Sequence, residues 1–289
     1  MNEDNKDQVF DYKFPAKKRG IIFYDDKYCQ LLKGDCLEVI PKKIKDKSVD
    51  IIITSPPYNL NIKYNTYKDN LPVEKYLDWF KEVCSLLKKV MKDDGSFFLN
   101  FGYSSKDPWI DLKVMLVAGE YFKLQNRFTW VKAISINEKS YGHFNPINSK
   151  RYINMTHELL FHFTKEGNVN LNKKAIGVPY VHPSNLTRWS GKKNEPEEEK
   201  GIRCRGNSWF IPYTTMKKQD KGDHPAVFPR SLPKWCIKIH GYNPETVVLD
   251  PFVGIGTTAI AAREMGTKAV GIDIDENYLR EAKKNVKDI

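Results

Sequence analysis

Hydrophobic positions along this chain follow two kinds of spacing, one typical of buried strands and one typical of helices. Val49–Thr54 contains three consecutive isoleucines, and such a β-branched run is typical of a strand inside a parallel sheet. Tyr76, Phe80 and Val83 begin a series of apolar residues at steps of three and four, which predicts an amphipathic helix over Pro72–Met91.

The same patterns predict the remaining elements. Further strands are expected over Ile21–Tyr24, Tyr28–Leu32, Ser96–Phe101, Phe128–Val131, Glu158–Thr164, Val247–Asp250 and Lys268–Asp273. Further helices are expected after Cys36 and over Asp111–Glu120, His224–Gly241, Gly256–Met265 and Glu276–Val286, with a turn at Asp93–Gly95. Strands that alternate with helices at both ends of the chain indicate an α/β fold with a doubly wound, mostly parallel sheet.

The regular pattern fades between Asn168 and Lys221, where Gly, Pro and Asn are frequent and an acidic run follows Glu195. We therefore expect a flexible N-terminal arm over residues 1–20, two halves of one α/β domain over 21–165 and 223–289, and a loop-rich insertion over 166–222.

Basic charge is concentrated around this insertion. Residues 123–221 carry 18 Lys plus Arg against 8 Asp plus Glu, so this segment holds +10 of the net charge of +11. A basic excess confined to one segment is typical of a polyanion-binding surface, whereas the alternative is an ordinary solvated surface. The candidate nucleic-acid contacts are Arg188, Trp189, Lys192, Arg203 and Arg205.

Composition excludes several other classes. No run approaches the roughly 18 apolar residues of a membrane helix, and the first 20 residues are too polar for a signal peptide. The 5 cysteines are dispersed without a C-x-x-C pair, which argues for the reducing cytoplasm and against a disulfide framework or a cysteine-rich zinc site. We expect no bound metal and no membrane association.

Candidate chemistry begins where the isoleucine strand ends, in Thr54-Ser55-Pro56-Pro57-Tyr58. Two consecutive prolines remove two backbone donors and stop the strand, so the chain becomes a stiff edge with free carbonyls. A hydroxyl, fixed carbonyls and the aromatic plane of Tyr58 form a suitable grip for a flat polar ligand such as a nucleobase.

A second motif follows the strand Val247–Asp250 and contains Gly254 and Gly256 before a helix. Glycines allow a ligand to approach the backbone closely, and we expect a side chain at Gly256 to occupy the ligand's space. Asp273 ends the next strand, at the spacing of an acid that accepts ribose hydroxyls. The glycine pattern also satisfies the dinucleotide fingerprint of nicotinamide and flavin enzymes, but Asp250 and Pro251 separate the strand from the glycines, unlike in that motif.

Together, Thr54-Ser-Pro-Pro-Tyr58 and Asp250-Pro-Phe-x-Gly-x-Gly-Thr-Thr258 closely resemble the motifs of DNA amino-methyltransferases, which use S-adenosylmethionine. The motif order resembles the family's beta group. The resemblance extends to Gly34-Asp-Cys36, Gly95-Ser-Phe-Phe-Leu-Asn-Phe-Gly102, His157-Glu-Leu-Leu-Phe161 and His224-Pro-Ala-Val-Phe-Pro229.

This resemblance implies that 21–165 is the catalytic half, 166–222 the target-recognition region and 223–289 the cofactor-binding half. It implies double-stranded DNA as substrate, a cognate type II restriction endonuclease as partner, and a monomer or dimer. It assigns S-adenosylmethionine to Asp35, Asp250, Phe252, Gly254, Gly256, Thr257, Asp273, His224 and Phe228. From the residues alone, Asp35 could equally be a helix cap and Asp273 a strand-end acid, and we expect His157 and His162 to be structural.

The catalytic residues implied by the resemblance are Ser55, Pro56, Pro57 and Tyr58. The amino group of a base is a poor nucleophile because its lone pair is delocalised into the ring. The Ser55 hydroxyl and the Pro56 carbonyl could accept its two N–H bonds and draw the nitrogen toward tetrahedral geometry. Tyr58 would stack on the base, which must be flipped out of the duplex.

Serine at position 55 indicates the target base, since Ser-Pro-Pro-Tyr is associated in this family with N4-cytosine and Asp-Pro-Pro-Tyr with N6-adenine. We expect N4-cytosine, with N6-adenine as the alternative. Carbon-5 methylation is disfavoured because no cysteine follows a proline in that chemistry's catalytic pattern. A non-catalytic DNA-binding protein with this fold, and an RNA or protein methyltransferase, remain further alternatives.

Overall fold

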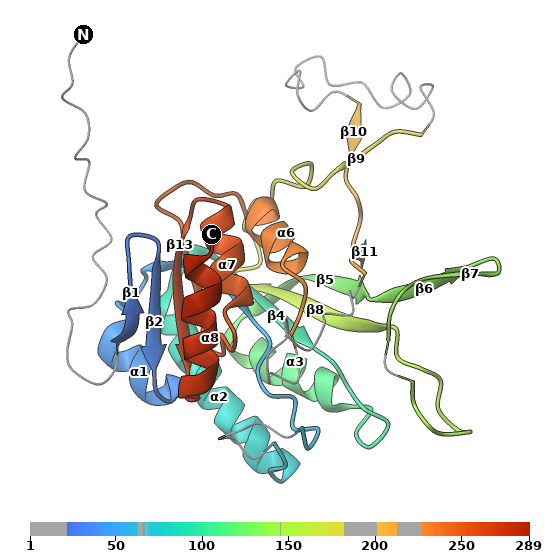
Figure 1. Ribbon diagram of the computed structural model, residues 1–289, viewed down its shortest axis with the longest axis horizontal. Helices are drawn as coiled ribbons and strands as arrows, with labels where there is room; N and C mark the ends of the chain where they lie inside the picture. The colour runs from blue at the N-terminus through green and yellow to red at the C-terminus, as the bar shows by residue number, and fades with distance from the viewer. Residues whose placement is uncertain (1–21, 63–65, 67–68, 145, 182–200, 213–226) are drawn as a thin grey trace.

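The computed structural model describes residues 22–62, 66, 69–144, 146–181, 201–212 and 227–289. Its centre is a nine-stranded sheet in the order β1-β2-β13-β12-β3-β4-β8-β5-β11 (Figure 1). The strands are β1 Ile22–Asp25, β2 Cys29–Lys33, β3 Val49–Thr54, β4 Met91–Phe101, β5 Lys123–Val131, β8 His157–Thr164, β11 Ser208–Phe210, β12 Val247–Asp250 and β13 Lys268–Asp273. The five strands from β2 to β4 are mutually parallel, while β8 runs antiparallel to both of its neighbours.

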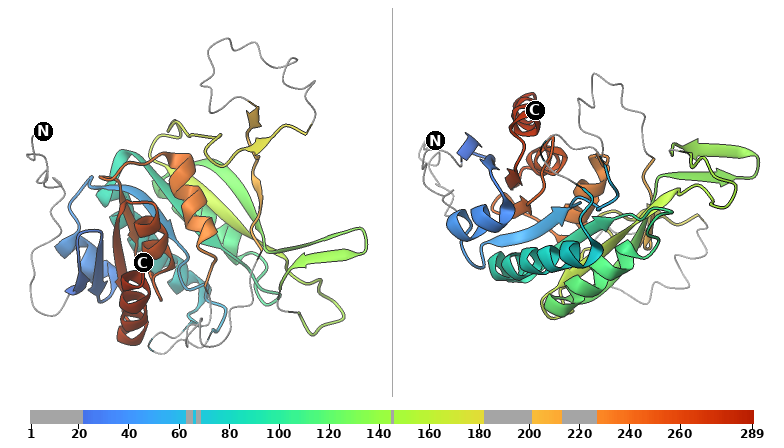
Figure 2. Two further views of the ribbon diagram at one scale, coloured as in Figure 1. Left: turned by 45° about the horizontal axis from the view of Figure 1, so that its top comes forward. Right: turned by 90° about the horizontal axis from the view of Figure 1, so that it is seen from below.

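Helices cover both faces of this sheet (Figure 2). One face carries α1 Cys36–Lys43, α2 Val73–Val90 and α3 Ile110–Tyr121, and the other carries α6 Ser231–His240, α7 Thr257–Glu264 and α8 Glu276–Lys287. Alternate residues of β3 contribute to the two cores: Ile52 packs with α2, whereas Ile51 and Ile53 pack on the opposite face. Burial on both faces explains why β3 is apolar at almost every position, and it bears out the predicted doubly wound α/β sheet.

Several predicted boundaries were wrong. Asp93–Gly95 is not a turn, because α2 passes directly into β4 and Met91 already pairs with Val49. The strand predicted at Phe128 begins at Lys123. The helix predicted over His224–Gly241 is present as α6 Ser231–His240, and residues 224–226 lie outside the described residues. The first residues of β4 and β5 include charged side chains and so lack the apolar pattern from which a strand is predicted. Their backbone groups nevertheless pair with the neighbouring strands.

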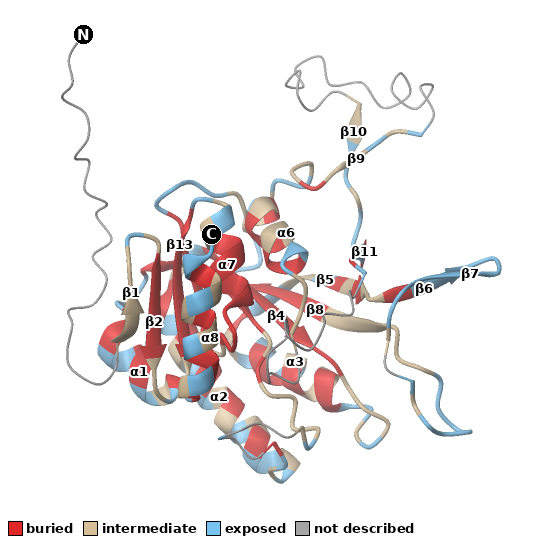
Figure 3. Ribbon diagram, viewed as in Figure 1, coloured by how far each residue is buried: buried red, intermediate tan, exposed pale blue. Residues whose placement is uncertain are grey.

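A β-hairpin was missed by sequence reasoning. Strands β6 Ala133–Ile136 and β7 Lys139–Gly142 pair antiparallel across a turn in which Asn137 has a φ of 54°. The hairpin projects from the end of β5 and is exposed over most of its length (Figure 3). It has no buried face of its own, and therefore no hydrophobic alternation from which it could be predicted.

The predicted loop-rich insertion contains more regular structure than expected. Short strands β9 Val178–Pro179 and β10 Ile202–Arg203 pair antiparallel, and β11 adds to the edge of the central sheet beside β5. Trp209 of β11 is fully buried, with its ring centroid 4.3 Å from that of Phe128. The β11 segment of the insertion is therefore part of the main core. Among the described helices, none is both long and apolar enough to cross a lipid bilayer.

Candidate active site

Both sequence motifs border one cavity, with a volume of about 380 Å³. It lies at the carboxyl ends of the parallel strands, where ligands bind in doubly wound sheets. Its lining includes Asp35, Ser55, Pro56, Pro57, Tyr58, Trp79, Asn100, Lys132, His157, Glu158, Phe228, Asp250, Phe252, Gly254, Thr257, Asp273 and Asp275. Segments almost 200 residues apart in sequence thus share one site because β3 and β12 are adjacent and parallel.

The Ser55–Tyr58 segment is held by neighbours on α2 and β4. The Pro57 carbonyl accepts a hydrogen bond from the Tyr76 hydroxyl at 2.6 Å. The Tyr58 ring stacks on Phe101, with centroids 4.3 Å apart and planes inclined by 28°. The rigid edge predicted from the two prolines is therefore also fixed by side chains from outside the motif.

The Tyr58 hydroxyl is the centre of a polar cluster that sequence reasoning missed. It lies 2.7 Å from the Ser55 Oγ, 2.7 Å from the Asn100 Nδ2 and 3.1 Å from the Glu158 Oε2. Asn100 also donates to Glu158 Oε2 at 2.7 Å, and the Lys132 ammonium contacts Glu158 Oε1 at 2.9 Å. Asn100 and Glu158 lie within motifs already noted in the sequence, but nothing in the sequence indicated that strands β4 and β8 bring them together.

Asp250 is predicted to bind the cofactor, and the structure gives its carboxylate three intramolecular donors. Thr54 Oγ1 donates to Oδ1 at 2.7 Å, Thr258 Oγ1 to Oδ2 at 2.6 Å and the Phe252 N–H to Oδ1 at 3.0 Å. Burial raises the pKa of Asp250 to about 6, against the opposing effect of these hydrogen bonds. Asp250 therefore ties β3, β12 and α7 together at the cavity wall.

The glycine turn after β12 is anchored by Asp273. Gly254 has a φ of 50°, and its N–H donates to Asp273 Oδ2 at 2.9 Å, while the Asp275 N–H donates to Oδ1 at 2.8 Å. Burial raises the pKa of Asp273 to about 6. A carboxylate has about four lone-pair positions, so Asp273 retains capacity for ligand hydroxyls.

Gly256 has a packing constraint that sequence reasoning missed. Its φ is 91°, and a Cβ on it would lie 3.0 Å from the Cβ and 3.2 Å from the Cα of Ala282 on α8. The predicted reason, that a side chain would occupy ligand space, stays a prediction, and helix α8 is a second obstacle to a side chain here. Glycine here permits α7 and α8 to pack closely.

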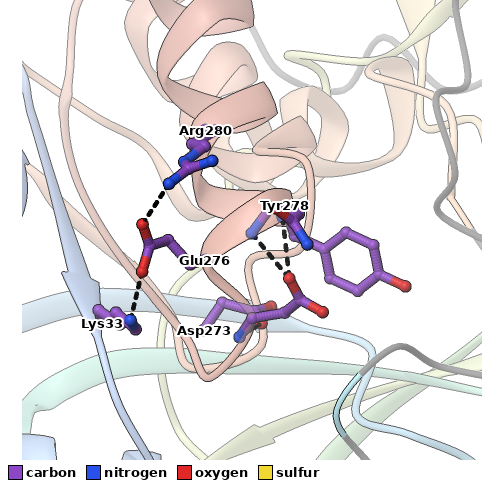
Figure 4. Close-up of polar contacts among 7 residues, drawn as sticks. Lys33, Asp273, Glu276, Tyr278 and Arg280 are labelled. Atoms are coloured by element: carbon purple, nitrogen blue, oxygen red, sulfur yellow. Dashed lines mark hydrogen bonds and ion pairs between the residues drawn. The ribbon is translucent and has the colours of Figure 1, made fainter.

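Two aspartates bordering the cavity cap helices. Asp35 accepts the Leu37 N–H at 2.9 Å as the N-cap of α1, which bears out the helix-cap alternative while leaving the side chain exposed beside the cavity. Asp275 caps α8 by accepting the Asn277 N–H at 2.7 Å. Figure 4 shows the start of α8, where Glu276 bridges Lys33 and Arg280 next to Asp273 and Tyr278.

The remaining predicted residues line the cavity, lie on the surface or fall outside the described part of the chain. Phe228, Phe252 and Thr257 line the cavity, and the Phe252 ring centroid lies 5.6 Å from that of Trp79. His224, Arg188, Trp189 and Lys192 fall outside the described residues.

Of the two described arginines of the predicted DNA-binding set, Arg203 is exposed on β10. Arg205 instead contacts the protein. Its guanidinium lies 4.4 Å from the Trp235 ring centroid, and its Nε donates to the Ile176 carbonyl at 2.8 Å. These two contacts link the insertion to α6, and the predicted contact of Arg205 with DNA stays a prediction.

The two histidines expected to be structural differ. His162 is fully buried, with its ring nitrogens 3.0 Å from Ser96 Oγ and 3.0 Å from Asn126 Nδ2, in agreement with the prediction. Burial lowers its pKa to about 3. His157 lines the cavity. Within the described ranges, no cluster of His, Cys, Asp and Glu is arranged to hold a metal ion.

Comparison with known proteins identifies the family. Residues 49–284 match the model of the N6/N4 DNA methylase family. The chain belongs to this family. The match covers both motifs and everything between them, so the predicted resemblance to DNA amino-methyltransferases is confirmed.

Sequence identity to individual relatives is low, but the matched regions cover most of both chains. The chain is 28% identical to DNA adenine methyltransferase YhdJ of Escherichia coli (strain K12), over 86% of this chain and 80% of the relative. It is 26% identical to the type II methyltransferase M.BglII of Bacillus subtilis, over 96% and 72%.

Solved structures share the fold. The cytosine-N4-specific PvuII DNA methyltransferase superposes with a TM-score of 0.66 at 20% identity, covering 92% of this chain and 88% of that one. The M1.HpyAVI–SAM complex gives 0.52 at 23% identity, covering 89% and 98%. The chain therefore shares its fold with these methyltransferase structures.

Proposed function

We propose that this DNA methylase transfers a methyl group from S-adenosylmethionine to the exocyclic N4 of a cytosine flipped out of duplex DNA. The observation that carries the proposal is that the Ser55–Tyr58 edge lines the same cavity as the Gly254 turn and Asp273. An acceptor-rich edge and a nucleotide-type turn within one cavity suit a reaction between a base and a nucleoside cofactor.

The residues at the glycine turn fit S-adenosylmethionine. Asp273 keeps lone pairs for ribose hydroxyls, and Asp35 borders the same cavity with an exposed carboxylate. Phe252 and Phe228 add apolar lining, and an aromatic face attracts a cation such as a sulfonium. When bound, the cofactor would supply an electrophilic methyl group.

At the other end of the cavity, Ser55 and Pro56 would accept the two N–H bonds of the target amino group. This arrangement localises the nitrogen lone pair and aims it into the cavity, so positioning and electrostatics supply the catalysis. The Tyr58 ring, which stacking on Phe101 holds in place, would contact the flipped base.

N4-cytosine is favoured because residue 55 is serine rather than aspartate. The likeness to the cytosine-N4-specific PvuII enzyme agrees with this choice. N6-adenine is the second candidate, and similarity to a DNA adenine methyltransferase favours it. Protection of host DNA in a restriction–modification system, with a cognate endonuclease for the same sequence, is supported by the similarity to type II methyltransferases.

The deciding experiment is methylation of unmodified genomic DNA with S-adenosylmethionine, followed by nucleoside digestion and mass analysis. N4-methyl-deoxycytidine is the expected product, and Ser55→Ala is the control for contaminating activity because it retains the cofactor end of the cavity. N6-methyl-deoxyadenosine would replace the first candidate by the second. No methylated nucleoside from a protein that binds S-adenosylhomocysteine would refute both.

A further inference from the structure

The hydrogen-bond directions around Tyr58 follow from the chemistry of its partners. Its hydroxyl has one hydrogen and contacts Ser55 Oγ at 2.7 Å, Asn100 Nδ2 at 2.7 Å and Glu158 Oε2 at 3.1 Å. An amide NH2 is only a donor and an ionised carboxylate only an acceptor. The single hydrogen of Tyr58 is therefore committed to Glu158, and the hydroxyl oxygen accepts from Asn100.

The remaining hydrogen bond joins Ser55 and Tyr58, and the other two bonds determine its direction. Because the hydrogen of Tyr58 points to Glu158, the contact between Ser55 and Tyr58 requires Ser55 to donate. A serine hydroxyl that donates its hydrogen to Tyr58 directs both of its lone pairs away from Tyr58. Ser55 then acts toward any ligand in the cavity as an acceptor only.

We propose that Glu158 is a positioning residue that orients the Ser55 hydroxyl as an acceptor for the amino group of the target base. The inference rests on the proposed function, since it assumes that Ser55 receives an N–H of that group. A serine free to rotate could instead donate to the amino nitrogen, which would occupy the lone pair needed for attack. Glu158 removes that unproductive arrangement through two hydrogen bonds in series.

Asn100 and Lys132 hold Glu158 in the required orientation. Asn100 donates to the same oxygen as Tyr58, at 2.7 Å, and Lys132 contacts the other oxygen at 2.9 Å. Asn100 is only 2% exposed, and the Lys132 and Glu158 side chains are each 18% exposed, so water competes weakly for these bonds. The carboxylate thus has a donor on each side and little freedom to rotate.

The proposal makes an unusual prediction for Glu158→Gln. The new amide oxygen would turn toward the Lys132 ammonium, because a bond to a charged donor is the stronger one. Its NH2 would then face Tyr58, whose hydrogen would be driven back onto Ser55. We expect single-turnover methyl transfer to fall at least about tenfold, with the Kd for S-adenosylhomocysteine and for DNA unchanged within about twofold.

Removing Lys132 should restore part of the activity. In Lys132→Met/Glu158→Gln no cation attracts the amide oxygen, so Asn100 and Tyr58 can both donate to it and the original direction returns. The double variant should be at least about threefold faster than Glu158→Gln alone. A second substitution that recovers activity is not expected if Glu158 only supports folding. Equal or slower transfer in the double variant would overturn the orientation argument, as would full activity in Glu158→Gln.

Two further measurements separate this proposal from the proposed function. Lys92→Met, which breaks the 2.6 Å ion pair with Asp50, is the matched control and should leave methyl transfer unchanged. Urea unfolding of Glu158→Gln with and without Tyr58→Phe tests the coupling without any activity. The midpoint shift caused by Glu158→Gln should at least halve in the Tyr58→Phe background. A wild-type protein without methyl transfer would refute the proposed function, whereas additive urea shifts would refute the hydrogen-bond series itself.

Discussion

Replacing Gly256 by alanine tests whether this glycine serves helix packing or ligand access. Two costs are expected. A non-glycine residue in the left-handed region costs roughly 1–2 kcal/mol, and Gly256 has a φ of 91°. The new Cβ would also lie 3.0 Å from the Ala282 Cβ, an overpacking that typically costs about 1–3 kcal/mol. The free energy of unfolding should therefore fall by about 2–5 kcal/mol even without any ligand.

Gly266→Ala provides the matched control. Gly266 follows the same helix with a φ of 70°, and a Cβ there meets nothing within 4 Å, so only the backbone cost applies. Urea unfolding of both variants, with and without S-adenosylhomocysteine, separates the two costs. The excess loss in Gly256→Ala should shrink in a Gly256→Ala/Ala282→Gly protein. If Gly256→Ala instead leaves unfolding unchanged and weakens only S-adenosylhomocysteine binding, the packing argument is wrong and the ligand explanation is supported.

Three further predictions concern other parts of the molecule. Thr54→Val removes the 2.7 Å hydrogen bond to Asp250 and should lower the free energy of unfolding by about 1.5–3 kcal/mol at pH 8. Because the raised pKa of Asp250 is about 6, its carboxyl group is mostly protonated at pH 5, and the loss measured by urea unfolding should be smaller there. An equal loss at both pH values would contradict this. His162 has a pKa lowered to about 3, so its contribution to stability is complete above the unfolded pKa near 6.5 and is lost as the pH falls toward 3, by up to about 2 kcal/mol at pH 5. In His162→Gln, the free energy of unfolding measured in urea should therefore change less between pH 7.5 and pH 5 than in the wild type. An unaltered change would exclude His162 as the cause of this pH dependence. Arg205→Ala should lower the melting temperature because it removes the contact with the Trp235 ring. Arg203→Ala should leave the melting temperature unchanged and, in fluorescence anisotropy, reduce by about one the slope of the logarithm of DNA affinity against the logarithm of salt concentration. The reverse pattern would exchange their roles.

The sequence was most informative where one residue type has one dominant physical consequence. The isoleucines of β3 had to be buried on both faces, and the prolines after Ser55 had to end the strand. The alternation of strands and helices predicted the sheet, and the Ser55–Tyr58 edge and the glycine turn near Asp273 were both found in sequence and line the cavity.

Contacts between distant strands could not be predicted in the same way. Glu158 and Asn100 meet because β8 runs antiparallel beside β4, and no local pattern encodes that pairing. Gly256 was correctly singled out as a required glycine, but its neighbour Ala282 lies on a helix whose packing distance is invisible in sequence. The burial of Trp209 at the sheet edge was likewise hidden in a segment with no strand periodicity.

The short ladder between β9 and β10 has a consequence for protein engineering. Pro179 pairs with Ile202, and the Tyr180 N–H donates to the Gly201 carbonyl at 3.1 Å, so the chain leaves and returns through one two-stranded stem. Tyr180 and Gly201 therefore lie side by side at the end of this stem. A replacement sequence of a different length could be grafted onto that stem without opening the central sheet, provided that Trp209 and its strand are left in the host.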